Sequence, residues 1–329
     1  MRIRRSIFAL SAAALAAVAL AGCASSAPTS SSSAPSPSAS AATDLCSAKV
    51  ASGSASDAVK VTGKVGAPAT ATFKSPLTVK ALQSSVVTTG SGQKLKSGDL
   101  VQFALTEYNA KTGAKNGAIG QVDGSLLPQQ ISADSLLGRV LGCATVGTRV
   151  VAVMPGAAAT STSAATEASI DVIDVKALVP AAAWGKAQAP QAGFPTVTLD
   201  TKGAPTITVP KTTPPKAVKI ETLKKGDGAA VKSGDTVLVQ YTGVLWKNGK
   251  VFDSSWTNGS PAQFATNQVI KGFGQGLTGA TVGSQVLVVV PPAAGYVDAK
   301  GKSIAQGSIP ANSTLVFAVD ILGVQHAGS

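Results

Sequence analysis

The chain has 329 residues, with 28 basic and 16 acidic side chains, a formal net charge of +12 and one histidine, His326. Zinc sites, Ser-His-Asp triads and Cys-His pairs need a histidine inside a structured site, but His326 stands in the C-terminal tail, where we expect it to be solvated. The lysines are scattered singly, without an arginine-rich face, which argues against nucleic-acid binding. We therefore expect no metal and no cofactor.

Residues 1–23 predict an export signal. A basic start at residues 2–5 precedes an apolar run at residues 7–20, which is too short to span a bilayer comfortably. The run ends in Leu-Ala-Gly-Cys at residues 20–23, which resembles the lipobox of bacterial lipoproteins. The resemblance implies that Cys23 is diacylated and becomes the mature N-terminus. An ordinary secretory signal with a chance cysteine is the alternative.

Residues 24–43 predict a disordered tether. They are rich in Ser, Ala, Pro and Thr and carry no charge, so they cannot bury enough apolar surface to fold. Signal, lipid anchor and tether together predict a protein held at the extracytoplasmic face of the cell membrane.

Two further cysteines, Cys46 and Cys143, form an even pair in a chain predicted to be exported. An oxidising compartment favours a disulfide between them. The competing interpretation is two buried free thiols.

Beyond the tether, two stretches of sequence repeat one another. The offset is 137 at the start, 136 through the middle and 146 at the end, so the second copy has ten extra residues after Pro291. Matching segments, first copy then second, are 66–68 and 203–205, 96–99 and 232–235, 145–147 and 281–283, and 173–175 and 319–321. The repeat predicts two domains, at residues 44–178 and 201–326, joined by a proline-rich linker at 179–200.

Both copies predict mainly β structure. Residues 284–290 and 314–322 are β-branched and apolar, as in buried strands. Residues 236–245 have the alternating pattern of a strand, in which successive side chains point to opposite faces. One face then carries Val237, Val239, Tyr241 and Leu245.

Helical spacing occurs at residues 269–278, where three glycines mean that the helix needs tertiary packing to form. The predicted fold class is α+β, with each copy an antiparallel sheet wrapped around one short α-helix.

Aromatic residues concentrate in the second copy: eight of the chain's 14 lie between Tyr241 and Phe317. A plain hydrophobic core is the simplest interpretation. Two details favour a site: Asp253 adjoins Phe252, and Tyr296 lies in a loop bounded by Pro and Gly, where a buried tyrosine needs a hydrogen-bond partner or a ligand.

Motifs in order across residues 219–324 resemble the FKBP-type peptidyl-prolyl cis-trans isomerases. They are Gly-Asp-Thr-Val at 234–237, Tyr-Thr-Gly-Val-Leu at 241–245, Gly-Lys-Val-Phe-Asp-Ser-Ser at 249–255, Gln-Val-Ile-Lys-Gly-Phe at 268–273, Gly-Tyr at 295–296 and Ile-Pro-Ala-Asn-Ser-Thr-Leu-Val-Phe at 309–317.

The resemblance implies a pocket for a prolyl peptide. Phe273 forms its floor, where the family usually has Trp. The implied catalytic residues are Tyr241, Phe252, Asp253, Ile270 (through its backbone N–H) and Tyr296 (through its hydroxyl). The implied substrate-binding residues are Phe264, Val269, Phe273, Ile309 and Phe317.

The implied reaction is rotation about an X–Pro bond, whose barrier of about 18–20 kcal/mol comes from amide resonance. The implied function is folding assistance to proline-containing exported polypeptides by a monomer, with macrolides as candidate inhibitors. The alternative is a non-catalytic FKBP-like chaperone or binding module.

The first copy lacks this pocket. It has smaller or polar residues at the corresponding positions, and the ten absent residues include the Tyr296 loop. The replacements are Leu105 for Tyr241, Asn116 and Gly117 for Phe252 and Asp253, Leu137 for Phe273, and Asp171 for Phe317. The first copy is therefore predicted to be an FKBP-like fold without catalytic activity.

Overall fold

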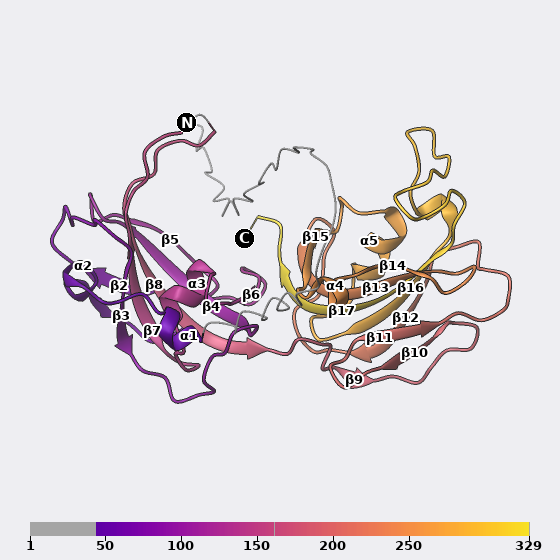
Figure 1. The fold of residues 1–329 in the computed structure, drawn as a ribbon, viewed down its shortest axis with the longest axis horizontal. Coiled ribbons are helices and arrows are strands. Elements are labelled where there is room, and N and C mark those ends of the chain that lie inside the picture. Colours follow the sequence, from indigo (N-terminus) through magenta and orange to yellow (C-terminus); the bar gives the residue numbers. More distant parts are fainter. Residues whose placement is uncertain (1–43, 161, 329) are drawn as a thin grey trace, which may run out of the picture. The chain divides into compact units, whose positions relative to one another are not determined.

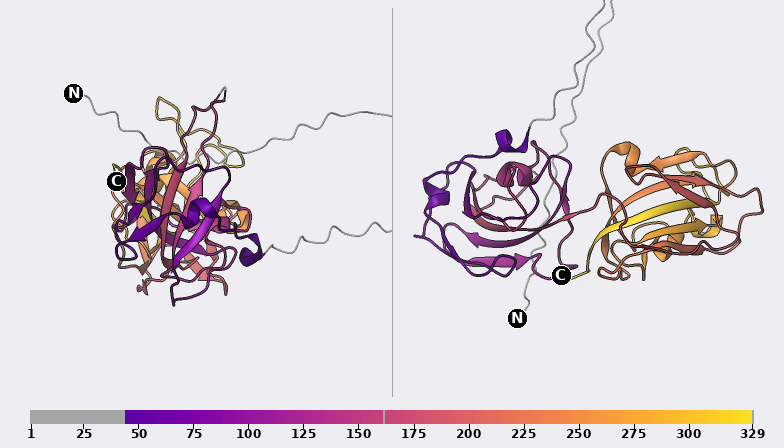
Figure 2. Two further views of the ribbon diagram at one scale, coloured as in Figure 1. Left: turned by 90° about the vertical axis from the view of Figure 1, so that its left-hand side faces the viewer. Right: turned by 90° about the horizontal axis from the view of Figure 1, so that it is seen from below.

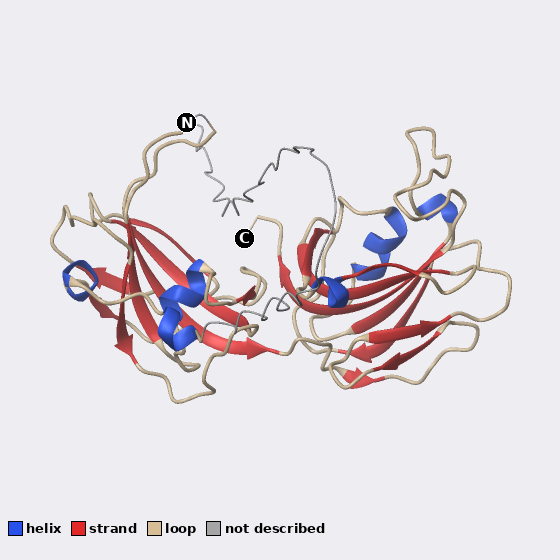
Figure 3. Ribbon diagram, viewed as in Figure 1, coloured by secondary structure: helices blue, strands red, loops and turns tan. Residues whose placement is uncertain are grey.

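The computed structural model describes residues 44–160 and 162–328 (Figure 1). The predicted signal, the lipidation site Cys23 and the tether lie outside the described residues. Within the described part of the chain, strands dominate and the helices are short (Figure 3). None of those helices is long and apolar enough to cross a bilayer.

The first copy forms an antiparallel sheet in the order β3-β7-β8-β4-β5, with β6 also paired to β4. The strands curve around helix α3 (Figures 1 and 2). The bounds are β3 Gln83–Thr88, β4 Leu100–Asn109, β5 Lys115–Ile119, β6 Gln129–Gln130, α3 Leu136–Leu141, β7 Arg149–Met154 and β8 Ser169–Val179. The side chain of Ser135 caps α3 by accepting a hydrogen bond from the N–H of Gly138.

The opposite face of the first sheet is covered by short elements that precede it. These are α2 Ser54–Asp57, β1 Lys60–Thr62 and β2 Thr70–Thr72, of which β1 and β2 form an antiparallel hairpin. Helix α1 Leu45–Ala48 lies on the α3 side, where Leu45 joins the core beneath that helix. A buried ion pair fixes the turn of this hairpin. Arg149 Nε lies 2.6 Å from Asp174 Oδ1, Arg149 Nη1 donates to the carbonyl of Gly63, and the N–H of Gly66 donates to Asp174 Oδ2.

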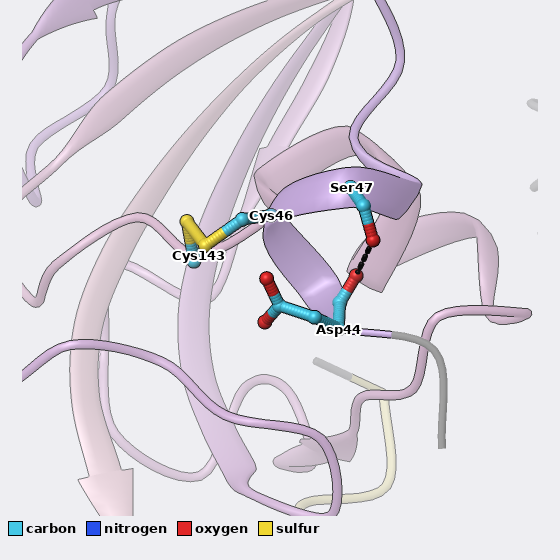
Figure 4. Close-up of a disulfide and its surroundings, with 4 residues drawn as sticks. All are labelled: Asp44, Cys46, Ser47 and Cys143. Atoms are coloured by element: carbon cyan, nitrogen blue, oxygen red, sulfur yellow. Dashed lines mark hydrogen bonds between the residues drawn. A yellow bond between two sulfur atoms is a disulfide. The ribbon is translucent and has the colours of Figure 1, made fainter. Parts of the chain in front are cut away.

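Cys46 in α1 and Cys143, just after α3, are joined by a disulfide (Figure 4). The bond spans 97 residues of sequence and ties the start of the first copy to the end of its helix. The Ser47 hydroxyl donates a hydrogen bond of 2.8 Å to the carbonyl of Asp44 at the start of α1.

The second copy forms a sheet in the same strand order, β12-β16-β17-β13-β14, with β15 paired to β13 and β9 added at the β12 edge. The bounds are β9 Lys186–Ala187, β12 Lys219–Lys225, β13 Thr236–Leu245, β14 Val251–Ser254, α4 Ser255–Asn258, β15 Ala262–Ala265, α5 Lys271–Leu277, β16 Gln285–Val290, η1 Pro292–Ala294 and β17 Leu315–Gln325. The predicted strands and the predicted helix are present within a few residues of their expected limits.

The glycines of α5 allow the helix to lie directly on β16. A Cβ atom at Gly272 would lie 2.5 Å from Val290 Cγ1, and one at Gly276 would overlap Val288. The glycines that lower the helix propensity of this segment are therefore the residues that allow close packing, as expected for a helix that forms through tertiary contacts.

The segment predicted as a linker, residues 179–200, includes the short strand β9 Lys186–Ala187 and the strand β10 Thr196–Leu199. β9 pairs with β12, and the hairpin of β10 Thr196–Leu199 and β11 Pro205–Thr208 covers the outer face of the second sheet. Phe194 and Val197 pack there against Trp246. Strand β13 is buried on both faces, and the scattered apolar residues of this segment help to cover its outer face.

Candidate functional site

The ten predicted site residues come together on the α5 side of the second sheet. Nine of them share one hydrophobic cluster, and the tenth, Asp253, is hydrogen-bonded to a member of it. Strands β13, β14, β15 and β17 contribute Tyr241, Phe252 with Asp253, Phe264 and Phe317. The start of α5 contributes Val269, Ile270 and Phe273, and the connection between η1 and β17 contributes Tyr296 and Ile309.

Phe273 lies at the centre of the aromatic cluster, with 4% of its surface exposed. Its ring centroid lies 4.9 Å from that of Phe317, 5.6 Å from Phe264 and 6.2 Å from Tyr241, each in an edge-to-face arrangement. Phe252 packs in the same way on Phe317 at 5.5 Å. Edge-to-face contacts hold aromatic rings in defined orientations, so these residues form a preorganised apolar surface with Phe273 as its base.

Tyr241 and Asp253 form the polar part of the site. The Tyr241 hydroxyl donates to Asp253 Oδ2, and the backbone N–H of Tyr241 donates to Ser255 Oγ at 2.8 Å. Burial, followed by the hydrogen bond and the negative charge of Asp253, holds the pKa of Tyr241 well above its ordinary value of 10.0. The phenol therefore stays protonated, and therefore a hydrogen-bond donor, throughout the physiological pH range.

Tyr296 follows η1 and lies half-buried against the same cluster. Burial raises the pKa of Tyr296, and the charge of Asp253 raises it further. The same carboxylate thus acts electrostatically on two phenols, which places Tyr241, Asp253 and Tyr296 in one neighbourhood. Ile309, further along the connection that leads to β17, is buried in the cluster.

Ile270 occupies the N-cap position of α5, and its carbonyl accepts hydrogen bonds from the N–H groups of Phe273 and Gly274. The N–H of an N-cap residue has no partner inside its own helix. The amide of Ile270 is therefore oriented by α5 without being used by it, beside the apolar side chains of Val269 and Phe273.

Sequence reasoning missed a second layer of polar contacts. Ser255 Oγ, which holds the backbone of Tyr241, itself donates to the side chain of the buried Gln240. The Ser-Ser pair after Asp253 was visible in the sequence, but its partner on β13 depends on the pairing of β13 with β14.

The expectation that His326 is solvated is wrong. Its Nδ1 lies 2.7 Å from Asp235 Oδ2, and the N–H of Ala327 donates to Asp235 Oδ1. Burial opposes ionisation of Asp235, but its hydrogen bonds outweigh burial and lower its pKa. The imidazole thus links the end of β17 to Asp235, the residue that precedes β13. Among the described residues no three His, Cys, Asp or Glu side chains gather into a metal-binding group.

A family model described as FKBP-type peptidyl-prolyl cis-trans isomerase matches residues 228–322. A probable FKBP-type peptidyl-prolyl cis-trans isomerase of Haemophilus influenzae is 49% identical over 106 residues, which are 32% of this chain and 41% of that protein. An FK506-binding protein of Streptomyces anulatus is 35% identical over 122 residues, which are 36% of this chain and 96% of that protein. The chain belongs to the FKBP-type peptidyl-prolyl cis-trans isomerase family.

The FKBP match includes every predicted site residue and lies wholly within the second copy. The crystal structure of FkpA from Escherichia coli is also similar, with 32% sequence identity and a TM-score of 0.30 over 39% of this chain and 51% of that chain. The chain spans about two fifths of the length of the Haemophilus protein.

Proposed function

We propose that the second copy catalyses cis–trans isomerisation of X–Pro bonds in exported polypeptides. The observation that carries this proposal is the Tyr241–Asp253 hydrogen bond at the side of a cluster of four phenylalanine rings. This arrangement combines a dry apolar surface for a prolyl ring with oriented polar groups for an amide carbonyl.

The chemistry needs no nucleophile and no proton transfer. A planar amide is more polar than a twisted one, so an apolar pocket disfavours the planar ground state relative to the transition state. The prolyl ring rests on Phe273, between Phe252 and Phe317, while the Ile270 N–H and the Tyr296 hydroxyl hold carbonyl groups of the substrate. Asp253 fixes the Tyr241 phenol beside the bond that rotates.

The test is catalysis of a proline-limited refolding reaction by the full chain. We expect combined replacement of Phe252→Ala, Asp253→Asn and Tyr296→Phe to lower kcat/KM at least about a hundredfold, because the two polar contacts contribute about 1.4 kcal/mol each and the Phe252 contact adds to them. The matched control is Leu105→Ala, at the position of the first copy that corresponds to Tyr241, and it should retain full activity. Full activity of the triple variant would disprove the assignment of the site.

The alternative, a non-catalytic chaperone, is distinguished by pocket blockade. The name of the Streptomyces relative states that it binds FK506, and we propose that the same aromatic surface here accepts this macrolide. If the second copy is an isomerase, FK506 at saturation abolishes catalysis of refolding. Client binding that persists under saturation, in a chain without catalysis, would favour the chaperone.

We further propose that the protein is a lipoprotein at the outer face of the cell membrane. The Leu-Ala-Gly-Cys sequence at residues 20–23 and the Cys46–Cys143 disulfide, which suits an oxidising compartment, support this location. Labelling with a radioactive fatty acid should mark the wild-type chain but not Cys23→Ala, and the variant should leave the membrane fraction. Equal labelling of both would disprove acylation at Cys23.

A further inference from the structure

The first sheet carries a carboxylate at the place where the second sheet carries a pocket phenylalanine. Asp171 on β8 pairs with Glu107 on β4 and Ala152 on β7. Phe317 on β17 has the same register, paired with Gly243 and Val288. Asp171 is thus the structural counterpart of an aromatic residue of the isomerase site.

Asp171 points to the helix side of the first sheet. Side chains alternate along a strand, and the next residues of the same parity, Ile173 and Val175, belong to the core beneath α3. Glu107 lies directly opposite Asp171 in the pairing of β4 with β8, so its side chain is on that face too. Two carboxylates therefore occupy one side of the degenerate pocket.

Asp171 is buried without full compensation. It has 5% of its surface exposed, and its Oδ1 accepts no hydrogen bond from the described residues. The Ser169 side chain interacts with the carboxyl group, but the neighbouring charge of Glu107 is repulsive. Burial of an unpaired carboxylate costs several kcal/mol. A hydrogen-bond donor or a cation that reaches Asp171 would therefore stabilise it.

The side chains around Asp171 are smaller than those at the corresponding positions of the second sheet. Leu105, Leu137 and Ala152 stand where the second copy has Tyr241, Phe273 and Val288. Leu105, Leu137 and Glu107 are half-buried, so this face reaches solvent. It offers apolar side chains near the surface and negative charge beneath them.

We infer that this face of the first sheet binds a polypeptide segment by taking up a lysine or arginine side chain between Glu107 and Asp171. The aliphatic stem of such a side chain packs on Leu105 and Leu137 while its charged end reaches the two carboxylates. This binding site is separate from the aromatic site of the second copy and does not depend on catalysis there.

A lysine or arginine fits this site better than a metal ion. A divalent cation bound through oxygen takes six or more ligands, and no three His, Cys, Asp or Glu side chains gather in the described part of the chain. Long-range attraction cannot explain binding of a cationic peptide either, because the whole chain has a net charge of +12. A preference for a cationic side chain must therefore come from local contacts with Glu107 and Asp171.

The experiment compares two fluorescent peptides bound to the full chain at pH 8, measured by anisotropy. One peptide has a single lysine between apolar residues, and the other has norleucine, of the same length and without charge, at that position. The expected result is a Kd at least about tenfold lower for the lysine peptide, the size of one charged hydrogen bond. In Asp171→Asn the two peptides should bind equally, and in Glu107→Gln the preference should shrink.

The matched control is Asp123→Asn, which removes an exposed carboxylate from the same copy and should keep the full preference for lysine. Proline-limited refolding should proceed at the wild-type rate with all three variants. Equal affinity of the wild type for both peptides would overturn the inference, as would a lysine preference that survives in Asp171→Asn. Far-UV circular dichroism establishes that each variant is folded, and Glu107→Gln tests the same site without changing a buried group.

Discussion

The hydroxyl of Tyr241 on β13 donates a hydrogen bond to Oδ2 of Asp253 on β14. Asp253 is paired with Gly243, so it is the diagonal cross-strand neighbour of Tyr241 on the same face of the sheet. The bond therefore depends on the local register of two strands and links the edge of the sheet to its aromatic centre.

We expect Tyr241→Phe and Asp253→Asn each to lower kcat/KM for prolyl isomerisation about tenfold, because each variant weakens or removes one charge-assisted hydrogen bond at the site. Since the two groups act through the same bond, the double variant should lose little more than either single variant. Tyr108→Phe removes a buried phenol of the first copy, whose hydroxyl donates to Ala69, and should leave kcat/KM unchanged. Additive losses in the double variant would show that the two residues act separately.

Asp171 predicts an unusual dependence of stability on pH. Burial, followed by the charge of Glu107, raises the pKa of Asp171 from 3.8 to about 7, against the hydrogen bond with Ser169. The folded state holds this proton more tightly than the unfolded state. The contribution of Asp171 to the stability of the first copy is therefore greatest below pH 4 and is lost as pH rises toward 7. The loss amounts to a few kcal/mol, at about 1.4 kcal/mol for each pKa unit.

Asp171→Asn should therefore raise the free energy of unfolding at pH 8 and change it little at pH 4. Urea unfolding followed by far-UV circular dichroism at both pH values measures the difference, with Asp123→Asn as the control. A stabilisation of equal size at pH 4 and pH 8 would contradict a raised pKa.

The disulfide should stabilise the first copy selectively. Closing a loop of 97 residues contributes about 4–5 kcal/mol in the chain-entropy model. Trp246 and Trp256 belong to the second copy, and Trp184 lies in the preceding segment against Gly283 of that copy, so tryptophan fluorescence reports on the second copy. Replacement of Cys46 and Cys143 by serine should lower the urea midpoint seen by far-UV circular dichroism but leave the fluorescence transition and the isomerase activity largely unchanged. Equal shifts of both transitions would refute selective stabilisation.

The second copy needs the segment that precedes it. The N–H of Ala183 donates to the buried carboxylate of Asp320, the N–H of Gln191 donates to Glu221, and Phe194 packs in the outer core. A fragment of residues 202–329 lacks all three contacts and should be about 3 kcal/mol less stable than a fragment of residues 181–329, because it loses two hydrogen bonds and the packing of a partly buried phenylalanine. Urea unfolding followed by the fluorescence of Trp246 and Trp256 measures this, and equal midpoints would show that the segment is dispensable.

The sequence was sufficient to predict the face of the second sheet that lies against α5. The alternation at residues 236–245 correctly placed Val237, Val239 and Tyr241 in the core beneath α5. Ordered motifs predicted site residues on five separate elements, and the fold brings these side chains into one cluster.

The burial of the opposite face of the second sheet was not predictable in the same way. Val244, on the opposite face of β13, is also buried, because a hairpin distant from it in sequence covers that face. Phe194 and Val197 lie among prolines and glycines, where local pattern indicates a linker and tertiary burial overrides it. The contact between His326 and Asp235 joins residues 91 positions apart, and no local pattern predicts such a pair.

Strand β9 has a consequence for a protein proposed to handle unfolded chains. It pairs with Lys224 and Lys225 at the end of β12, and the N–H of Gln188 continues along that strand by donating to the carbonyl of Leu223. An open strand edge would present unpaired backbone groups on which an extended client could add as a further strand and aggregate. By occupying part of this edge, with lysines along it, β9 leaves fewer backbone groups of β12 open to such an added strand.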